Sequence, residues 1–236
     1  MRLAERTLVI SRRSDKARRE RFTAQALAVG LEAWDYCDAF DGTGGRLSTG
    51  TPSAHGRQGR AAPAPLSPGE LGCLLSHMAA WRAGLALGLE SLCVLEDDTE
   101  FDPHHFQERW RDFMAAMPDD WLMVHVGEPA CSSDTVLSHA APQRLGVEHK
   151  WAHPQEHLGP RGDYCSRVGQ QYGTWMMVLR PLAMQMLSAA AERAAMSEPA
   201  DWLLLGLFAT GRVYRPTQEL FRVRDEAGIQ QTVVVP

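Results

Sequence analysis

The chain has 236 residues, 44% hydrophobic and 22% charged, which suffices for one substantial core, so we expect a single domain over residues 1–236. Its formal net charge of -5 argues against nucleic-acid binding, because nucleic-acid-binding proteins present basic surfaces. Five cysteines in an odd total, without a CxxC pair, predict reduced thiols and a cytoplasmic protein rather than a disulfide framework.

No stretch of the sequence has the pattern of a membrane anchor. The apolar run at residues 7–10 is too short for a signal peptide. The tract at 73–89 contains His77 and Arg82 and is too short to span a bilayer. Six basic residues fall between positions 12 and 21. We interpret most of them as a solvated helix face, and expect at most a peripheral contact with an anionic inner leaflet.

The N-terminal third predicts a strand at residues 7–11, a helix at about 14–29 and a second strand near 32–37. Residues 42–65 are rich in Gly, Pro, Ser and Thr and have no hydrophobic periodicity. We expect them to form an exposed mobile loop that acts as a flap over a ligand site.

A helix is predicted to begin after Ser67. Ser67 is the expected N-cap and Pro68 the first helical residue, and Glu70 completes a capping box. The apolar residues at helical spacing should face the core; they are Leu71, Leu74, Leu75 and Met78.

A second line on this helix contains Cys73, His77 and Trp81, so His77 lies off the leucine stripe. A helical histidine taken alone is more often structural than functional. Ser76 can likewise hydrogen-bond back to its own helix. Structural and ligand-binding roles therefore both stay open for these residues.

The most informative segment is the apolar run at residues 92–95, which ends in Glu96, Asp97 and Asp98. A short continuous apolar run is typical of a buried strand, and open α/β sheets bind ligands beyond the carboxyl ends of their strands. Carboxylates this close repel one another unless a cation lies among them, and oxygen ligands favour Mg²⁺ or Mn²⁺. Such a cation could hold a diphosphate; an ordinary acidic turn is an equally good interpretation.

Further along, we predict a helix at 103–117, a strand at 121–126, a strand at 174–179 and a helix at 181–195. Residues 129–172 lack periodicity and should form irregular structure around a substrate cleft. The alternation of strands and helices predicts an α/β fold with one open, mostly parallel sheet flanked by helices.

Four blocks in order resemble glycosyltransferase family 25: the opening VISRRSDKARRERF, AFDG at residues 39–42, ELGCLLSHMAAW at 70–81 and VLEDD at 94–98. The segment GTWMMVLRPLAMQML at 173–187 resembles a later strand–helix block of the family. Pro199 and Asp201 are similar to its late Pro-x-Asp element. The stretch between Glu128 and Tyr172 matches no family block.

The resemblance implies a GT-A-like domain with a nucleotide-sugar-binding half at 1–127 and an acceptor-side half at 128–236. It implies a metal-dependent, inverting transfer of a sugar to a hydroxyl of a glycan, peptide or small molecule. The implied cofactors are Mn²⁺ or Mg²⁺ and a UDP-sugar, with UDP-galactose the first donor to test. A role in lipopolysaccharide biosynthesis would place the protein in the cytoplasm or at the inner membrane face.

The resemblance also suggests roles for individual residues. Glu96 and Asp98 are the expected metal ligands, and Asp97 is expected to contact ribose or sugar hydroxyls. The chain has Glu96 where the general Asp-x-Asp pattern has Asp, and Ser11-Arg12 where Asn-Leu is more usual. The expected nucleotide contacts are Ser11, Arg12, Asp41, Gly42, Ser76 and His77.

The expected general base is Asp201, with Glu128 second because it follows a strand end. Asp201 could instead be the N-cap of a helix that begins at Trp202.

Two other classes of function stay open. A nucleotidyltransferase that makes sugar nucleotides should show an early Gly-rich phosphate loop, and the VISRRSDK turn has no glycine. A catalytically silent relative that binds a glycan or a protein would keep the sheet and lose the acids, whereas this chain retains them.

Overall fold

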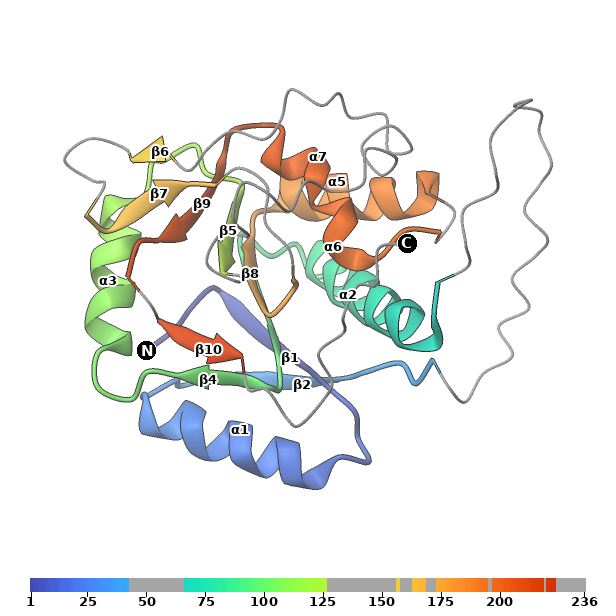
Figure 1. Ribbon diagram of the computed structural model, residues 1–236, viewed down its shortest axis with the longest axis horizontal. Coiled ribbons are helices and arrows are strands. Elements are labelled where there is room, and N and C mark those ends of the chain that lie inside the picture. The colour runs from blue at the N-terminus through green and yellow to red at the C-terminus, as the bar shows by residue number, and fades with distance from the viewer. Residues whose placement is uncertain are drawn as a thin grey trace, which may run out of the picture.

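The computed structural model describes residues 1–42, 66–126, 156–157, 163–168, 173–194, 197–218 and 220–223. Within these residues the centre of the molecule is an eight-stranded sheet (Figure 1). In spatial order its strands are β2 (Asp35–Asp38), β1 (Arg6–Ser11), β3 (Leu92–Glu96), β8 (Met176–Leu179), β5 (Met123–Val126), β9 (Val213–Pro216), β7 (Cys165–Arg167) and β6 (Glu156–His157). A two-stranded antiparallel sheet pairs β4 (Thr99–Phe101) with β10 (Phe221–Val223).

Most strands of the large sheet share one direction. β2, β1, β3, β5, β9 and β6 run one way, and β8 and β7 run the opposite way. The expected class, an open and mostly parallel α/β sheet flanked by helices, is confirmed.

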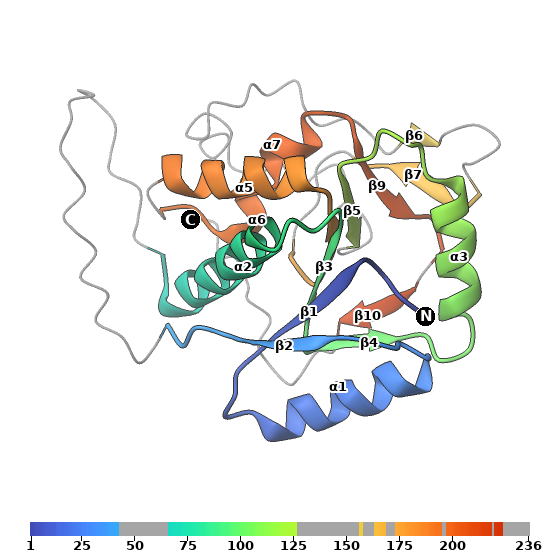
Figure 2. The ribbon, with the colours of Figure 1, turned by 180° about the vertical axis from the view of Figure 1, so that it is seen from behind.

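Helices cover both faces of the sheet (Figures 1 and 2). One face packs on α1 (Lys16–Ala28) and α3 (Phe106–Ala116). The other packs on α2 (Pro68–Ala86), α5 (Pro181–Arg193), α6 (Ala200–Leu203) and α7 (Leu205–Phe208). Along β3 the side chains alternate: Leu92 and Val94 join the α2 layer, whereas Cys93 and Leu95 join the α1 layer.

Helix α2 begins as its sequence predicts. The Ser67 hydroxyl accepts from the Glu70 N–H at 3.3 Å, and the Glu70 carboxylate accepts from the Ser67 N–H at 2.7 Å. The predicted core stripe is only partly right. Leu74 and Met78 are buried, and Leu71 and Leu75 are partly exposed. Of the second line, His77 and Trp81 are buried and Cys73 is partly buried, because α5 and the sheet both pack on this helix.

Several short elements were not predicted. They are the strands β4, β6, β7, β9 and β10. The expectation of irregular structure at 129–172 is wrong where β6 and β7 add the outer strands of the sheet. Glu128 and the predicted flap beyond residue 42 lie outside the described residues.

Among the helices of the described ranges, none combines the length and apolar character that crossing a membrane requires. Four cysteines are described, and none of these four forms a disulfide: Cys37, Cys73, Cys93 and Cys165.

Candidate functional site

The polar residues predicted from separate motifs meet at one edge of the sheet. Because β1, β2 and β3 are parallel, their carboxyl ends lie together, with Ile10 opposite Glu96 and Ser11 opposite Asp38. The Ala39 N–H donates to the Ser11 carbonyl at 2.9 Å, which brings the AFDG segment to the same edge. The structure therefore places the first, second and fourth family blocks side by side.

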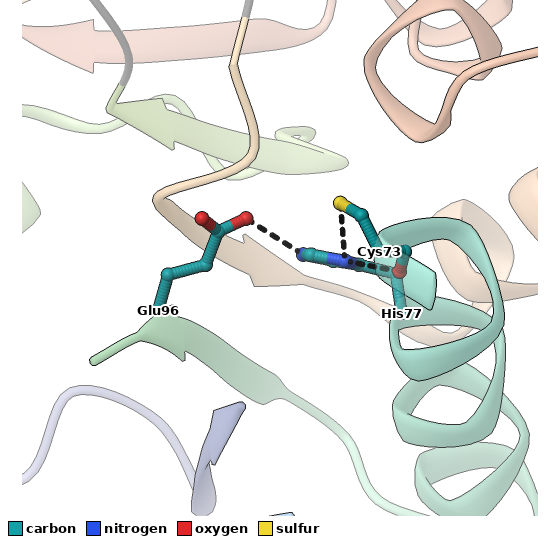
Figure 3. Close-up of side chains that lie close together, drawn as sticks. All are labelled: Cys73, His77 and Glu96. Atoms are coloured by element: carbon teal, nitrogen blue, oxygen red, sulfur yellow. Dashed lines mark hydrogen bonds and ion pairs between the residues drawn. The ribbon is translucent and has the colours of Figure 1, made fainter. Parts of the chain in front are cut away.

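The acidic cluster divides where β3 ends. Glu96 continues the side of Leu92 and Val94 and faces α2 (Figure 3). Asp97 takes the opposite side and faces α1, where Arg18 Nη2 lies 3.0 Å from Asp97 Oδ1 and 2.9 Å from Asp98 Oδ2. The two aspartates thus share one guanidinium, while Glu96 turns away from it.

Arg18 only partly balances the negative charge of Glu96, Asp97 and Asp98. Burial raises the pKa of Asp97, and burial followed by the charge of Glu96 raises the pKa of Asp98 to about 6, against the lowering effect of Arg18. Asp98 Oδ1 is buried and has no hydrogen-bond partner among the described residues. A buried carboxylate oxygen without a donor is a position that a cation would stabilise.

A second polar cluster lies on the α2 side. His77 is fully buried, and its Nδ1 lies 3.0 Å from the Cys73 carbonyl oxygen and 3.6 Å from Cys73 Sγ. His77 Nε2 lies 3.7 Å from Glu96 Oε1 and has no hydrogen-bond partner among the described residues (Figure 3). Burial, and then the charge of Glu96, raises the pKa of the Cys73 thiol. His77 therefore lies off the leucine stripe as predicted, and on α2 it faces Glu96.

Residues 173–175, which lead into β8, connect Glu96 to His125 and Asp201. Thr174 Oγ1 donates to Glu96 Oε1 at 2.6 Å, and the Trp175 carbonyl accepts from the Glu96 N–H at 2.9 Å. The Gly173 carbonyl lies 2.8 Å from Nε2 of buried His125, and the Gly173 backbone hydrogen-bonds to the Asp201 carboxylate. Residues 173–175 thus link the acidic cluster to Asp201.

Asp201 lies in the first turn of α6, and the N-cap interpretation is wrong. Pro199 occupies the N-cap position, and no side chain caps this helix. Burial raises the pKa of Asp201, whereas hydrogen bonds from the backbone of Gly173, Asp201 and Trp202 lower it. Its charge also contributes to raising the pKa of the Cys73 thiol, which places Asp201 at the same end of α2.

The AFDG segment packs directly on the start of α2. Ser76 is buried; its hydroxyl donates to the Gly72 carbonyl at 2.6 Å and accepts from the Phe40 N–H at 2.9 Å. A Cβ at Gly42 would overlap the Pro68 carbonyl oxygen. Ser76 and Gly42 therefore position the segment that carries exposed Asp41, and direct nucleotide contacts by the three residues stay predictions.

At the end of β1 the two predicted nucleotide contacts differ. Ser11 is buried, accepts from Arg19 Nε at 3.2 Å and hydrogen-bonds to Asp97. Arg12 is exposed, with its Nη2 3.8 Å from Asp15. Ser11 therefore holds Asp97 of the acidic cluster through a hydrogen bond, whereas Arg12 is accessible to a ligand.

Two residues of the site, Arg18 and Thr174, were not predicted from the sequence. Arg18 stands in a run of basic residues in which no spacing singles it out. Thr174 falls inside the GTW segment of a family block, and that position was the available signal.

The model of the family described as glycosyltransferase family 25 (LPS biosynthesis protein) matches residues 4–138. Procollagen galactosyltransferase 2 of Mus musculus is 38% identical over 69 residues, covering 27% of this chain and 10% of that protein. A Rattus norvegicus relative, named probable inactive glycosyltransferase 25 family member 3, is 33% identical over 64 residues, or 26% of this chain and 11% of its own length. The matches thus span about a tenth of these curated relatives.

A solved structure of galactosyltransferase LgtC, in complex with donor and acceptor sugar analogues, aligns with a TM-score of 0.46 and 12% identity, covering 91% of this chain and 73% of that one. The family match extends over more than half of the sequence and includes the four N-terminal blocks that carried the resemblance. The chain therefore belongs to glycosyltransferase family 25, a family of sugar-transferring enzymes.

Proposed function

We propose that this chain is an active, metal-dependent, inverting glycosyltransferase that moves a sugar from a UDP-sugar, galactose first, to a hydroxyl. The observation that carries the proposal is the partly buried acidic cluster at the carboxyl end of β3, in which the buried Asp98 Oδ1 has no hydrogen-bond partner among the described residues. That edge of an α/β sheet is where such folds bind nucleotides.

The residues present fit a divalent cation. Glu96 and Asp98 would hold Mn²⁺ or Mg²⁺, because carboxylate oxygens suit these ions and because the raised pKa of Asp98 reflects negative charge without enough compensation. When bound, the cation would neutralise the charge that develops on the leaving diphosphate. Arg18 would offset the repulsion between Asp97 and Asp98 and fix the direction of both carboxylates.

The rest of the donor site would come from the neighbouring strand ends. Asp97 is within the cluster and would accept hydrogen bonds from ribose or sugar hydroxyls. Arg12 and Asp41 are exposed at the same edge, where they would contact the nucleotide. Ser11, Ser76 and Gly42 would hold these groups in place through the contacts described above.

Asp201 would act as the general base. Its pKa is raised by burial, which brings a carboxylate closer to the pH range in which it can accept a proton. The hydroxyl oxygen of the acceptor would bond to the anomeric carbon as the bond to the diphosphate breaks, and the hydroxyl proton would pass to the Asp201 carboxylate. Backbone hydrogen bonds from Gly173 and Trp202 would orient that carboxylate.

We further propose a glycan hydroxyl as the acceptor, in keeping with the description of the family as an LPS biosynthesis protein. We place the protein in the cytoplasm with at most a peripheral contact to the inner membrane face. The exposed side chains of Arg13 and Lys16 near the donor edge would favour an anionic surface.

The test is a screen of UDP- and GDP-sugars with Mn²⁺ or Mg²⁺, in which mass spectrometry detects donor hydrolysis and acceptor products. The proposal expects release of the nucleoside diphosphate from at least one UDP-sugar. Sugar-nucleotide synthesis from a sugar phosphate and a nucleoside triphosphate would establish the nucleotidyltransferase alternative. Donor binding without turnover would make this chain a silent relative, as the name of the Rattus norvegicus protein states for that protein.

A further inference from the structure

The cluster of Cys73, His77 and Glu96 has the composition of a metal site. One ligand atom from each residue lies within 4.8 Å of the other two (Figure 3). Cys73 and His77 are four residues apart on α2, so both side chains project from one face of the helix. Glu96 reaches the same space from the end of β3.

The hydrogen bonds fix which nitrogen of His77 carries a proton. Nδ1 lies 3.0 Å from the Cys73 carbonyl oxygen, and a carbonyl only accepts, so Nδ1 donates. In the neutral ring Nε2 then presents a lone pair to Glu96 Oε1, which already accepts from Thr174. Two acceptors therefore face each other in a space where His77 is fully buried, and a positive species between them would relieve the repulsion.

The distance between the two acceptors distinguishes a proton from a metal ion. His77 Nε2 and Glu96 Oε1 are 3.7 Å apart, which is longer than a charged hydrogen bond. Zinc bonds of about 2.0–2.2 Å to nitrogen and oxygen give an N···O separation of about 3.4 Å at the tetrahedral angle, and a slightly wider angle gives about 3.7 Å. The observed spacing suits two ligands of one ion.

We propose that Cys73, His77 and Glu96 bind a zinc ion through Glu96 Oε1, next to the diphosphate cation, for which Glu96 would use its other carboxylate oxygen. A thiolate and an imidazole favour zinc over Mg²⁺ or Mn²⁺, which prefer oxygen ligands. Binding would release the thiol proton of Cys73 to solvent and leave the Sγ–Zn bond in its place. The three ligands would leave a fourth coordination position open.

Neighbouring groups support the ligands in the way that zinc sites require. The Cys73 carbonyl holds the far ring nitrogen of His77, and the Thr174 hydroxyl holds Glu96, so both ligands are oriented before the ion arrives. The ion would fix Glu96 at the head of the acidic cluster. This proposal does not depend on transfer activity.

The test uses the full chain, purified without chelators, with zinc measured by mass spectrometry and then exchanged for Co²⁺. We expect one zinc per chain, and for the cobalt protein a thiolate-to-cobalt charge-transfer band in the near ultraviolet. Cys73→Ser should abolish the band, whereas Cys37→Ser, a matched change outside the cluster, should keep it. Thr174→Val should weaken zinc affinity about 10- to 100-fold, the usual cost of losing a partner of a ligand.

Asp98→Asn separates this site from the donor cation site and should leave the zinc content and the cobalt band unchanged. Circular dichroism of each variant establishes that it is folded. A folded wild-type protein that binds neither ion would overturn the proposal and leave a protonated His77 paired with Glu96. A cobalt band that survives Cys73→Ser, or zinc lost equally in Asp98→Asn, would overturn it too.

Discussion

Arg18 is the basic side chain that contacts both Asp97 and Asp98 in the described part of the chain, and its removal should have a pH-dependent cost. We consider Arg18→Met, which keeps an unbranched side chain and good helix propensity and removes the charge. Asp97 and Asp98 would then lie close together without their shared guanidinium. The variant should respond by taking up a proton on Asp98.

The magnitude follows from the pKa of Asp98, which is about 6. Protonating that group at pH 7 costs about 1.4 kcal/mol, and losing the charged hydrogen bond to Asp97 costs about 1.5 to 3 kcal/mol. Arg18→Met should therefore lower the free energy of unfolding by about 3 to 4 kcal/mol at pH 7, in line with the loss of one partner of a buried pair. At pH 5, where Asp98 is already protonated, only the Asp97 contribution of about 1.5 to 3 kcal/mol should remain.

The direction in which stability changes with pH follows from the difference between the folded and unfolded pKa values of Asp98. Because the folded-state pKa of Asp98 lies above its unfolded value, this group favours folding at low pH, and its contribution is lost as the pH rises from about 4 through about 6. Urea unfolding of the variant and the wild type at pH 5 and pH 7 measures the difference. Arg82→Met, which breaks an exposed pair with Glu192, is the control and should cost at most about 1 kcal/mol at either pH. An equal loss for Arg18→Met at both pH values would refute the reasoning.

Two further substitutions test the site. Asp201→Asn should lower the single-turnover transfer rate by about 10²- to 10⁴-fold. It should leave UDP-sugar affinity unchanged, because the base faces the acceptor. Normal transfer rates in both Asp201→Asn and Glu128→Gln would mean that another carboxylate is the base. Gly42→Ala should lower the melting temperature, because its Cβ would overlap the Pro68 carbonyl oxygen. Gly206→Ala, which has open space around its Cβ, is the control and should not lower it. Equal melting temperatures for the two variants would contradict the close packing at Gly42.

The elements with strong local signals were predictable from the sequence. The capping box at Ser67 and Glu70 fixes the start of α2 through contacts within four residues. The apolar run of β3 likewise predicts a buried strand, and its parallel partners bring Ser11 and Glu96 to one edge. These predictions needed only periodicity and the rule that parallel strands end together.

The missed features depend on contacts between distant segments. β9 and β10 are short and gain their hydrogen bonds from β5 and β4, so no local pattern identifies them. The split of the acidic cluster follows from the alternation of side chains along β3, which sends Glu96 toward α2 and Asp97 toward α1. The partners themselves, Arg18 and Thr174, become recognisable only after α1 and β8 have been placed beside β3.

The measurement that tests the central claim most directly is donor turnover with and without a divalent cation. Wild-type protein should hydrolyse or transfer from a UDP-sugar with Mn²⁺ present and stop in excess chelator. Asp98→Asn should show no turnover at any Mn²⁺ concentration while keeping its fold, and Asp119→Asn, an exposed acid outside the cluster, should match the wild type. Full turnover in excess chelator, or by Asp98→Asn, would contradict the account.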